Sequence, residues 1–139
     1  MSGMTVPVIG MTAFDFTNVA TANKSVEVIA AQNIDVTPYT EATLLVRVHA
    51  IDVDASAEID VIAYAVLPSP QDPSKQFRSS TALGTVTLNN NNQDGTLEIA
   101  SLTPPLGAFL TIAVKGKTAT STPTTVTATI SVDLSLKSS

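Results

Sequence analysis

Residues 125–136 read TVTATISVDLSL, and this stretch decides the fold class. Apolar side chains occupy every second position from Val126 to Leu136, and Thr, Ser or Asp fills the positions between them. A period of two residues is that of a β-strand, in which β-branched residues are favoured. An α-helix would scatter the same apolar side chains around its circumference. The stretch therefore predicts a half-buried strand.

Shorter segments of the chain repeat this alternation. Residues 108–114 do so ahead of Lys115-Gly116-Lys117, which we interpret as a turn. Further short strands are expected at residues 25–31, 82–88 and 96–100, with loops at residues 89–95 and at the prolines Pro68, Pro70, Pro73, Pro104 and Pro105. No stretch has a period of 3.6 residues. We predict an all-β chain, an antiparallel β-sandwich of about eight strands, with a jelly-roll preferred over an immunoglobulin-like arrangement.

The composition excludes several classes of function. The 139 residues include no Cys and one His, which excludes disulfides, thiolate metal sites and multi-histidine centres. A net charge of −5 has the wrong sign for a surface that neutralises nucleic-acid phosphates. Only 14% of the residues are charged, against about 25% in a typical soluble domain. We therefore expect no cofactor and no nucleic-acid partner, and few charges that keep neighbouring copies apart.

The length suits one domain, which we place at residues 25–139. Two interpretations of residues 1–24 stay open: an edge strand of that domain, or an extended arm that packs on a neighbouring subunit. Removing an arm should weaken attachment without unfolding the sandwich. The apolar side chains of this segment are Val6, Val8, Ile9, Phe14 and Phe16. No signal peptide or membrane span is expected, because the segment lacks a basic start and no run approaches ~20 apolar residues.

Residues 43–53 and 58–67 predict a β-hairpin around the loop Asp54-Ala55-Ser56-Ala57. Pairing Val53 with Glu58 gives one uniformly apolar face for the core and a second face that also carries large apolar side chains. An exposed apolar face of that extent marks an interaction surface. The predicted interface consists of Leu45, Arg47, His49, Ile51, Ile62, Tyr64 and Val66. The alternative is that the N-terminal segment or the proline loop covers this face within one subunit.

Groups that could carry chemistry are few. His49 is the only histidine, and no G-x-S-x-G motif presents a nucleophile, so we assign no catalytic residue and expect no enzyme. Asp52, Asp54 and Glu58 have the spacing of an EF-hand loop, but Ala57 and Ala63 stand where that loop needs Gly and Glu. These three carboxylates remain candidates for a loose cation site at the turn.

The whole pattern resembles the jelly-roll capsid decoration (cement) proteins of tailed bacteriophages. The resemblance is carried by residues 34–40 (IDVTPYT), 43–48 (TLLVRV), 105–111 (PLGAFLT) and the closing Thr/Val strand. It implies a homotrimer on the outer surface of the virion capsid, made in the host cytoplasm. Its partner would be the major capsid protein, and it would clamp neighbouring capsomers. The family has no catalytic signature to carry over.

A cement acts through area buried over several contacts, so it needs apolar patches and no active site. Two alternatives stay open. A tail or baseplate component would share every feature described. A carbohydrate-binding or adhesion module would instead be a monomer, with glycans stacked on Phe77, Tyr39 or Phe109.

Overall fold

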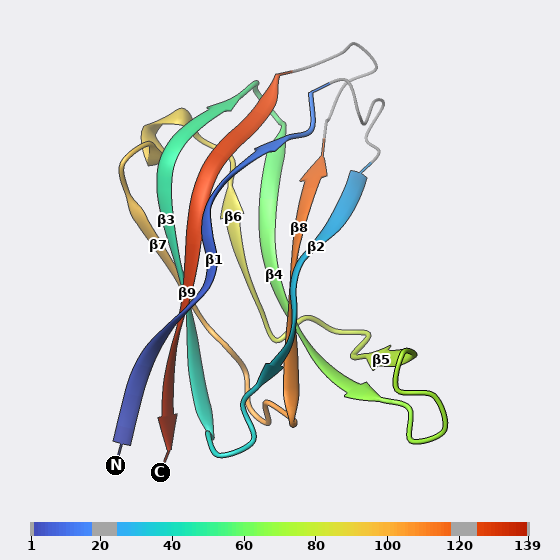
Figure 1. Ribbon diagram of the computed structural model, residues 1–139. Helices are drawn as coiled ribbons and strands as arrows, with labels where there is room; N and C mark the ends of the chain where they lie inside the picture. The colour runs from blue at the N-terminus through green and yellow to red at the C-terminus, as the bar shows by residue number, and fades with distance from the viewer. Residues whose placement is uncertain (1, 18–24, 118–124, 139) are drawn as a thin grey trace.

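A computed structural model describes residues 2–17, 25–117 and 125–138, and these residues form nine β-strands (Figure 1). One short 3-10 helix, η1 (Asn91–Gln93), lies between β6 and β7. Among the described residues, no helix is long and apolar enough to cross a membrane. The strands are β1 (Ser2–Asp15), β2 (Ser25–Asp35), β3 (Glu41–Val53), β4 (Glu58–Pro68), β5 (Gln76–Arg78), β6 (Gly84–Leu88), β7 (Leu97–Ser101), β8 (Phe109–Lys117) and β9 (Val126–Ser138).

The strands form two antiparallel sheets, so the predicted all-β sandwich is confirmed. Sheet A has the order β1-β9-β3-β7, and sheet B has the order β2-β8-β4, with β5 and β6 both paired to β4. Outside the β4–β5–β6 segment, each strand lies in the other sheet from the strand before it. The hydrogen-bonded pairs are nested along the chain: β1 with β9, β2 with β8, β3 with β7, and β4 with β6.

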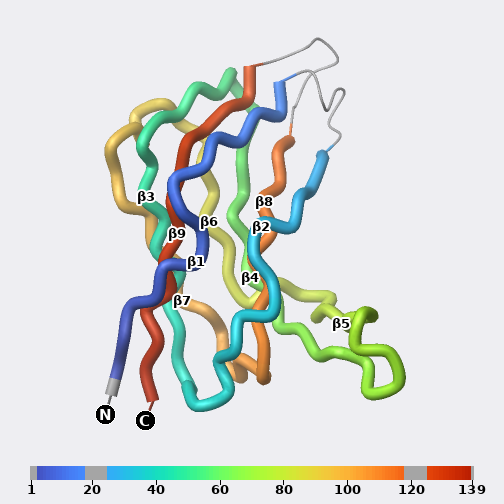
Figure 2. The backbone as a smooth tube through the Cα atoms, in the orientation of Figure 1, coloured from blue at the N-terminus to red at the C-terminus, as the bar shows by residue number. Residues whose placement is uncertain are grey.

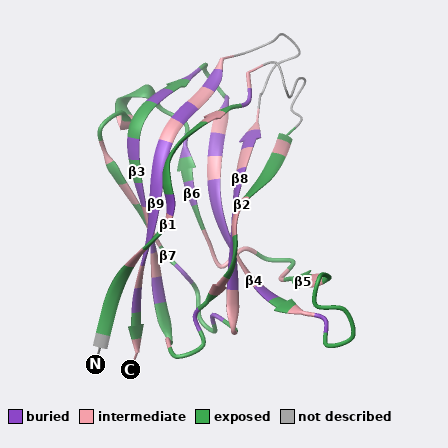
Figure 3. Ribbon diagram, viewed as in Figure 1, coloured by how far each residue is buried: buried purple, intermediate pink, exposed green. Residues whose placement is uncertain are grey.

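The core lies between the inner faces of the two sheets. Buried and exposed residues alternate along β3, as the purple and green bands of Figure 3 show. Along β9 the apolar side chains at every second position face this core, and Ile130 and Leu134 are fully buried. Sheet B contributes Ile59, Leu110 and Ile112 to the same cluster. Alternation of this kind is the expected pattern for strands that have one face against a second sheet.

The N-terminal segment forms an edge strand of this sandwich. β1 pairs with β9 from Ser2↔Ser138 to Asp15↔Thr127, with register shifts after Pro7 and Ile9. Figure 2 follows the two strands side by side to the neighbouring chain ends. Of the predicted arm side chains, Ile9 and Phe16 are buried, and Val6, Val8 and Phe14 pack partly against the core. Residues 2–15 therefore match the edge-strand interpretation, and residues 18–24 lie outside the described part.

The predicted turn at Lys115-Gly116-Lys117 is wrong, because these residues continue β8 and pair with both β2 and β4. Gly116 is buried under the ring of Phe16, which follows β1 and reaches over to sheet B. A Cβ atom at Gly116 would lie 2.1 Å from Cγ of Phe16. The glycine therefore marks a close approach of an aromatic ring to the strand rather than a change of chain direction.

The predicted hairpin of residues 43–53 and 58–67 is also wrong. Its loop is a tight turn, in which the N–H of Ala57 donates to the carbonyl of Asp54 at 3.0 Å. However, β3 belongs to sheet A and β4 to sheet B, so the turn joins two sheets. Each strand carries its own apolar face, and these faces meet across the core rather than lying side by side. An alternating pattern is compatible with both arrangements.

Candidate functional site

The predicted interface residues do not form one surface. Leu45, Arg47, His49 and Ile51 belong to sheet A, whereas the other three belong to sheet B. Leu45 is half-buried, and Arg47 and His49 are exposed on the outer face. Ile51 turns inward and is buried, because the register of β3 against β9 shifts between Val48 and Ala50.

On sheet B, the outer face around Tyr64 is covered within the subunit. The guanidinium of Arg78 lies 4.0 Å from the ring centroid of Tyr64 and 2.6 Å from the carboxylate of Glu27. This hydrogen bond and charge raise the pKa of Arg78. Ile62 and Val66 are buried, with 6% and 5% of their surface exposed. Arg78 lies on β5, which follows the proline loop, so this covering comes from β5 and not from the two segments that the alternative interpretation named.

Arg47 and His49 face β9 rather than Tyr64. Nη2 of Arg47 donates to Oδ2 of Asp133 at 2.6 Å, and Nε2 of His49 lies 3.0 Å from Oγ of Ser131. The bond to Asp133 and its negative charge raise the pKa of Arg47. Both Asp133 and Ser131 are buried, although they lie on the outer face of the sheet. The four side chains therefore form a polar cluster that joins β3 to β9.

The Ser131–His49 contact does not assemble a catalytic constellation. A nucleophile of this type needs a histidine that is oriented by a third group and an Oγ that substrate can reach. Asp133, the carboxylate of the cluster, binds Arg47, and Ser131 is only 8% exposed. Ser131 also lies within the central strand β9, opposite Arg47 in the ladder. The cluster is built to hold two strands together.

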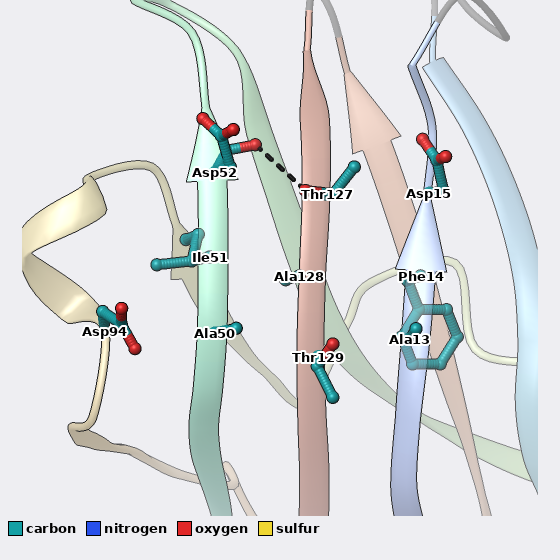
Figure 4. Close-up of a pocket in the computed structure, with 10 residues that line it drawn as sticks. All are labelled: Ala13, Phe14, Asp15, Ala50, Ile51, Asp52, Asp94, Thr127, Ala128 and Thr129. Atoms are coloured by element: carbon teal, nitrogen blue, oxygen red, sulfur yellow. Dashed lines mark hydrogen bonds between the residues drawn. The ribbon is translucent and has the colours of Figure 1, made fainter.

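Above this cluster, a groove lies on the outer face of sheet A (Figure 4). Two rows of side chains cross its strands: Ala13, Thr129 and Ala50 in one, and Asp15, Thr127 and Asp52 in the other. Asp94, which follows η1, completes the rim. The floor is made of small side chains, and the carboxylates stand at its edges. In the described part of the chain, no three His, Asp or Glu side chains are close enough together to hold a metal ion.

The three carboxylates proposed for a cation site are divided between the two sheets. Asp52 borders the groove on sheet A, and Glu58 begins β4 in sheet B. Asp54 lies in the turn between them, where its Oδ2 accepts the N–H of Thr125 at 2.8 Å. A folded EF-hand directs its ligands into one loop. Here the turn directs them to different surfaces.

Glu58 has a carboxylate neighbour, Asp60, two positions along β4. Burial raises the pKa of Glu58, and so do the hydrogen bond with Asp60 and its charge, while Lys117 and Lys115 act in the opposite direction. Oδ1 of Asp60 is buried, with no partner among the described groups. A hydrogen bond between two carboxyl groups requires a proton on one of them. The pair is therefore a site where the fold favours proton uptake.

Two exposed large apolar side chains of sheet A lie on β7, and the sequence did not predict their exposure. Leu97 and Ile99 are 52% and 59% exposed. They stand beside Arg47 and Leu45 on the outer face, while Glu98 and Ala100 are half-buried. Hydrophobicity alone predicts the opposite orientation, because the more apolar face of an amphipathic strand is expected to face the core. Only the pairing of β7 with β3 shows that Leu97 and Ile99 face outward and Glu98 and Ala100 face inward.

Two neighbouring hollows at one end of the sandwich contain aromatic side chains. Tyr39 lines the first, together with Pro104, Pro105 and Gly107. Phe77, 56% exposed, lines the second, which also reaches Gly107. Phe109, the third aromatic proposed for glycan stacking, is half-buried in β8.

Comparisons of the chain with protein-family models, curated protein sequences and solved structures found no match.

Proposed function

We propose that this protein is a non-enzymatic structural protein of a virion that self-associates and binds between capsomers to stabilise the capsid. The observation that carries the proposal is the exposed pair Leu97 and Ile99 on an edge strand of sheet A. Apolar side chains on a strand edge favour contact with another protein surface. The partner proposed beyond the chain itself is the major capsid protein, on the outer capsid surface. The location on a capsid rests on the resemblance to cement proteins, which implies a trimer.

The strand order supports a jelly-roll topology. In a jelly-roll, a long antiparallel hairpin is rolled into two sheets. The nested pairs β1–β9, β2–β8, β3–β7 and β4–β6 follow that scheme, with β5 as an addition at the edge of β4. An immunoglobulin-like order would place successive strands such as the first and second in one sheet. Here β1 and β2 lie in different sheets.

The geometry of the polar groups supports a non-enzymatic role. The Ser131–His49 contact lacks an orienting carboxylate, and the groove carboxylates are too dispersed to bind a metal together. In contrast, Leu97 and Ile99 are exposed on β7 beside Leu45 and Arg47. Exposed apolar side chains without a catalytic arrangement suit a protein that acts by burying contact area against its partners.

The direct test is binding to capsids of the phage that encodes the chain, stripped of their decoration. The purified protein should sediment with these capsids and raise the temperature at which they break. A protein that neither binds them nor changes their heat resistance would contradict a cement role. Binding to isolated tails alone would assign it to the tail or baseplate instead.

A second candidate function is a carbohydrate-binding or adhesion module. It is favoured by the neighbouring hollows around Gly107, which present Tyr39 and Phe77. Flat apolar faces of sugars stack on aromatic rings. A glycan array decides between the functions: affinity that is lost in both Tyr39→Ala and Phe77→Ala, in a monomeric protein, would favour this module.

A further inference from the structure

The outer edge of β7 carries main-chain groups that point away from the sheet. Within the described residues, β7 pairs with β3 alone. Thr96 and Leu102, which flank β7, exchange hydrogen bonds with β3. Because hydrogen-bonded positions alternate along an antiparallel pair, the N–H and C=O groups of Leu97, Ile99 and Ser101 point to the open side. A second β-strand is the partner that can pair with all of these groups in one ladder.

The other sheet edges carry features that discourage such pairing. β1 contains Pro7 and two register shifts, and β2 contains two register shifts. β5 has three residues and ends in Arg78, and β6 exposes Thr85 and Thr87. Bulges, prolines and charged or polar side chains are the devices by which proteins protect strand edges. β7 has no Pro, Lys or Arg and no register shift, and it exposes Leu97 and Ile99.

The β7 edge is complementary to itself. In an antiparallel alignment centred on Ile99, Leu97 of one copy lies opposite Ser101 of the other, and Ile99 opposite Ile99. All three residues direct main-chain groups to the open side, so each of the three pairs exchanges two hydrogen bonds. The outer face then carries a continuous apolar row of Leu45 and Ile99 from both copies. Glu98 lies opposite Ala100, so no like charges meet along the strand.

We propose that two copies of this chain associate through their β7 edges, antiparallel and about a two-fold axis at Ile99. The contact joins two A sheets into one continuous sheet. It rests on the self-association in the proposed function and assigns one contact within it. Since a two-fold contact pairs two copies, it can link either two single chains or two trimers.

Cross-linking tests the register of this contact. The chain has no cysteine, so Ile99→Cys introduces a single thiol at the two-fold axis. Opposite residues of a hydrogen-bonded antiparallel pair are about 5.5 Å apart between Cα atoms, within reach of a disulfide. Mild oxidation should convert Ile99→Cys to a covalent dimer.

Leu97→Cys is the register control. In the proposed alignment its thiol and its copy are four residues apart, about 13 Å, which is beyond disulfide reach. Equal cross-linking of both variants, or none of Ile99→Cys in a self-associated sample, would overturn the proposed register.

Mass measurements on charged variants separate this contact from self-association in general. Ile99→Lys places like charges opposite each other and should raise the dissociation constant of the two-fold contact about tenfold or more. Ile29→Lys is the matched control, because Ile29 is 48% exposed on the protected edge β2. It should associate like the wild type, and circular dichroism checks that both variants fold.

The outcomes are distinguishable. A wild-type protein that stays a monomer overturns both this contact and the proposed self-association. A self-associated wild type whose mass is unchanged by Ile99→Lys overturns the β7 contact and leaves the proposed function standing. Dissociation by Ile29→Lys but not by Ile99→Lys would place the contact at β2 instead.

Discussion

At Gly116, the packing of Phe16 against sheet B requires a residue that has no side chain. A Cβ atom at Gly116 would lie 2.1 Å from Cγ and 2.5 Å from Cβ of Phe16. Rotation of the Phe16 side chain can move Cγ, but it leaves Cβ in place, so it cannot relieve the clash. Gly116→Ala should therefore destabilise the fold by about 1–3 kcal/mol, the usual effect of overpacking. Urea unfolding followed by circular dichroism measures the change.

Gly10→Ala is the matched control, because nothing lies within 4 Å of a Cβ at Gly10. It should leave stability unchanged or slightly raised. In a Phe16→Gly background, which removes both Cβ and the ring, Gly116→Ala should cost much less, since the two changes share one contact. An equal cost in both backgrounds would mean that the Phe16 side chain is not what requires glycine.

Glu58 makes the stability of the fold depend on pH. Its pKa in the folded state is raised above its ordinary 4.5, first by burial and then by Asp60. The folded state therefore binds the proton more tightly than the unfolded state, and stability falls as pH rises from below 4.5 through the raised pKa.

Glu58→Gln removes this contribution to the pH dependence of stability. Unfolding free energies of variant and wild type, measured across that pH range, should diverge in favour of the variant as pH rises. A difference that is constant with pH would contradict the assignment. The expected divergence is small, because the carboxyl group remains partly exposed.

At the scale of elements, β1 behaves as part of the sandwich. It pairs with β9 along most of its length and buries Ile9. Deleting residues 1–15 should lower the free energy of unfolding by more than the roughly 1.5–3 kcal/mol that burial of one Ile contributes. Denaturant unfolding of the truncated chain measures this loss. An unchanged unfolding midpoint would support the alternative of a detachable arm.

The strands differed in how well their sequences predicted their places. β9 was predictable because its apolar residues alternate over a long stretch and face the core throughout. The burial of Ser131 and Asp133 on the other face of β9 was not predictable, because it depends on Arg47 and His49, which contact these residues from β3. The partner of β3 was not predictable either, because a short turn suits both a hairpin and a crossing between sheets.

At the scale of the whole molecule, the candidate interaction surface of the structure differs from the one that the sequence predicted. The sequence predicted an interface at Ile62, Tyr64 and Val66, but Arg78 on the next strand, β5, covers Tyr64. Leu45, which the sequence also placed in the interface, lies next to Ile99 of β7 on the outer face of sheet A. Surfaces of this kind depend on which strands become neighbours, so they follow from topology and not from the alternation of any one strand.

Self-association is the central claim, and light scattering tests it most directly. The mass of the wild-type protein should be measured over a range of micromolar concentrations. We predict a mass above the 14.4 kDa of the single chain, rising with concentration to that of a defined oligomer. A mass of 14.4 kDa at every concentration would contradict the claim.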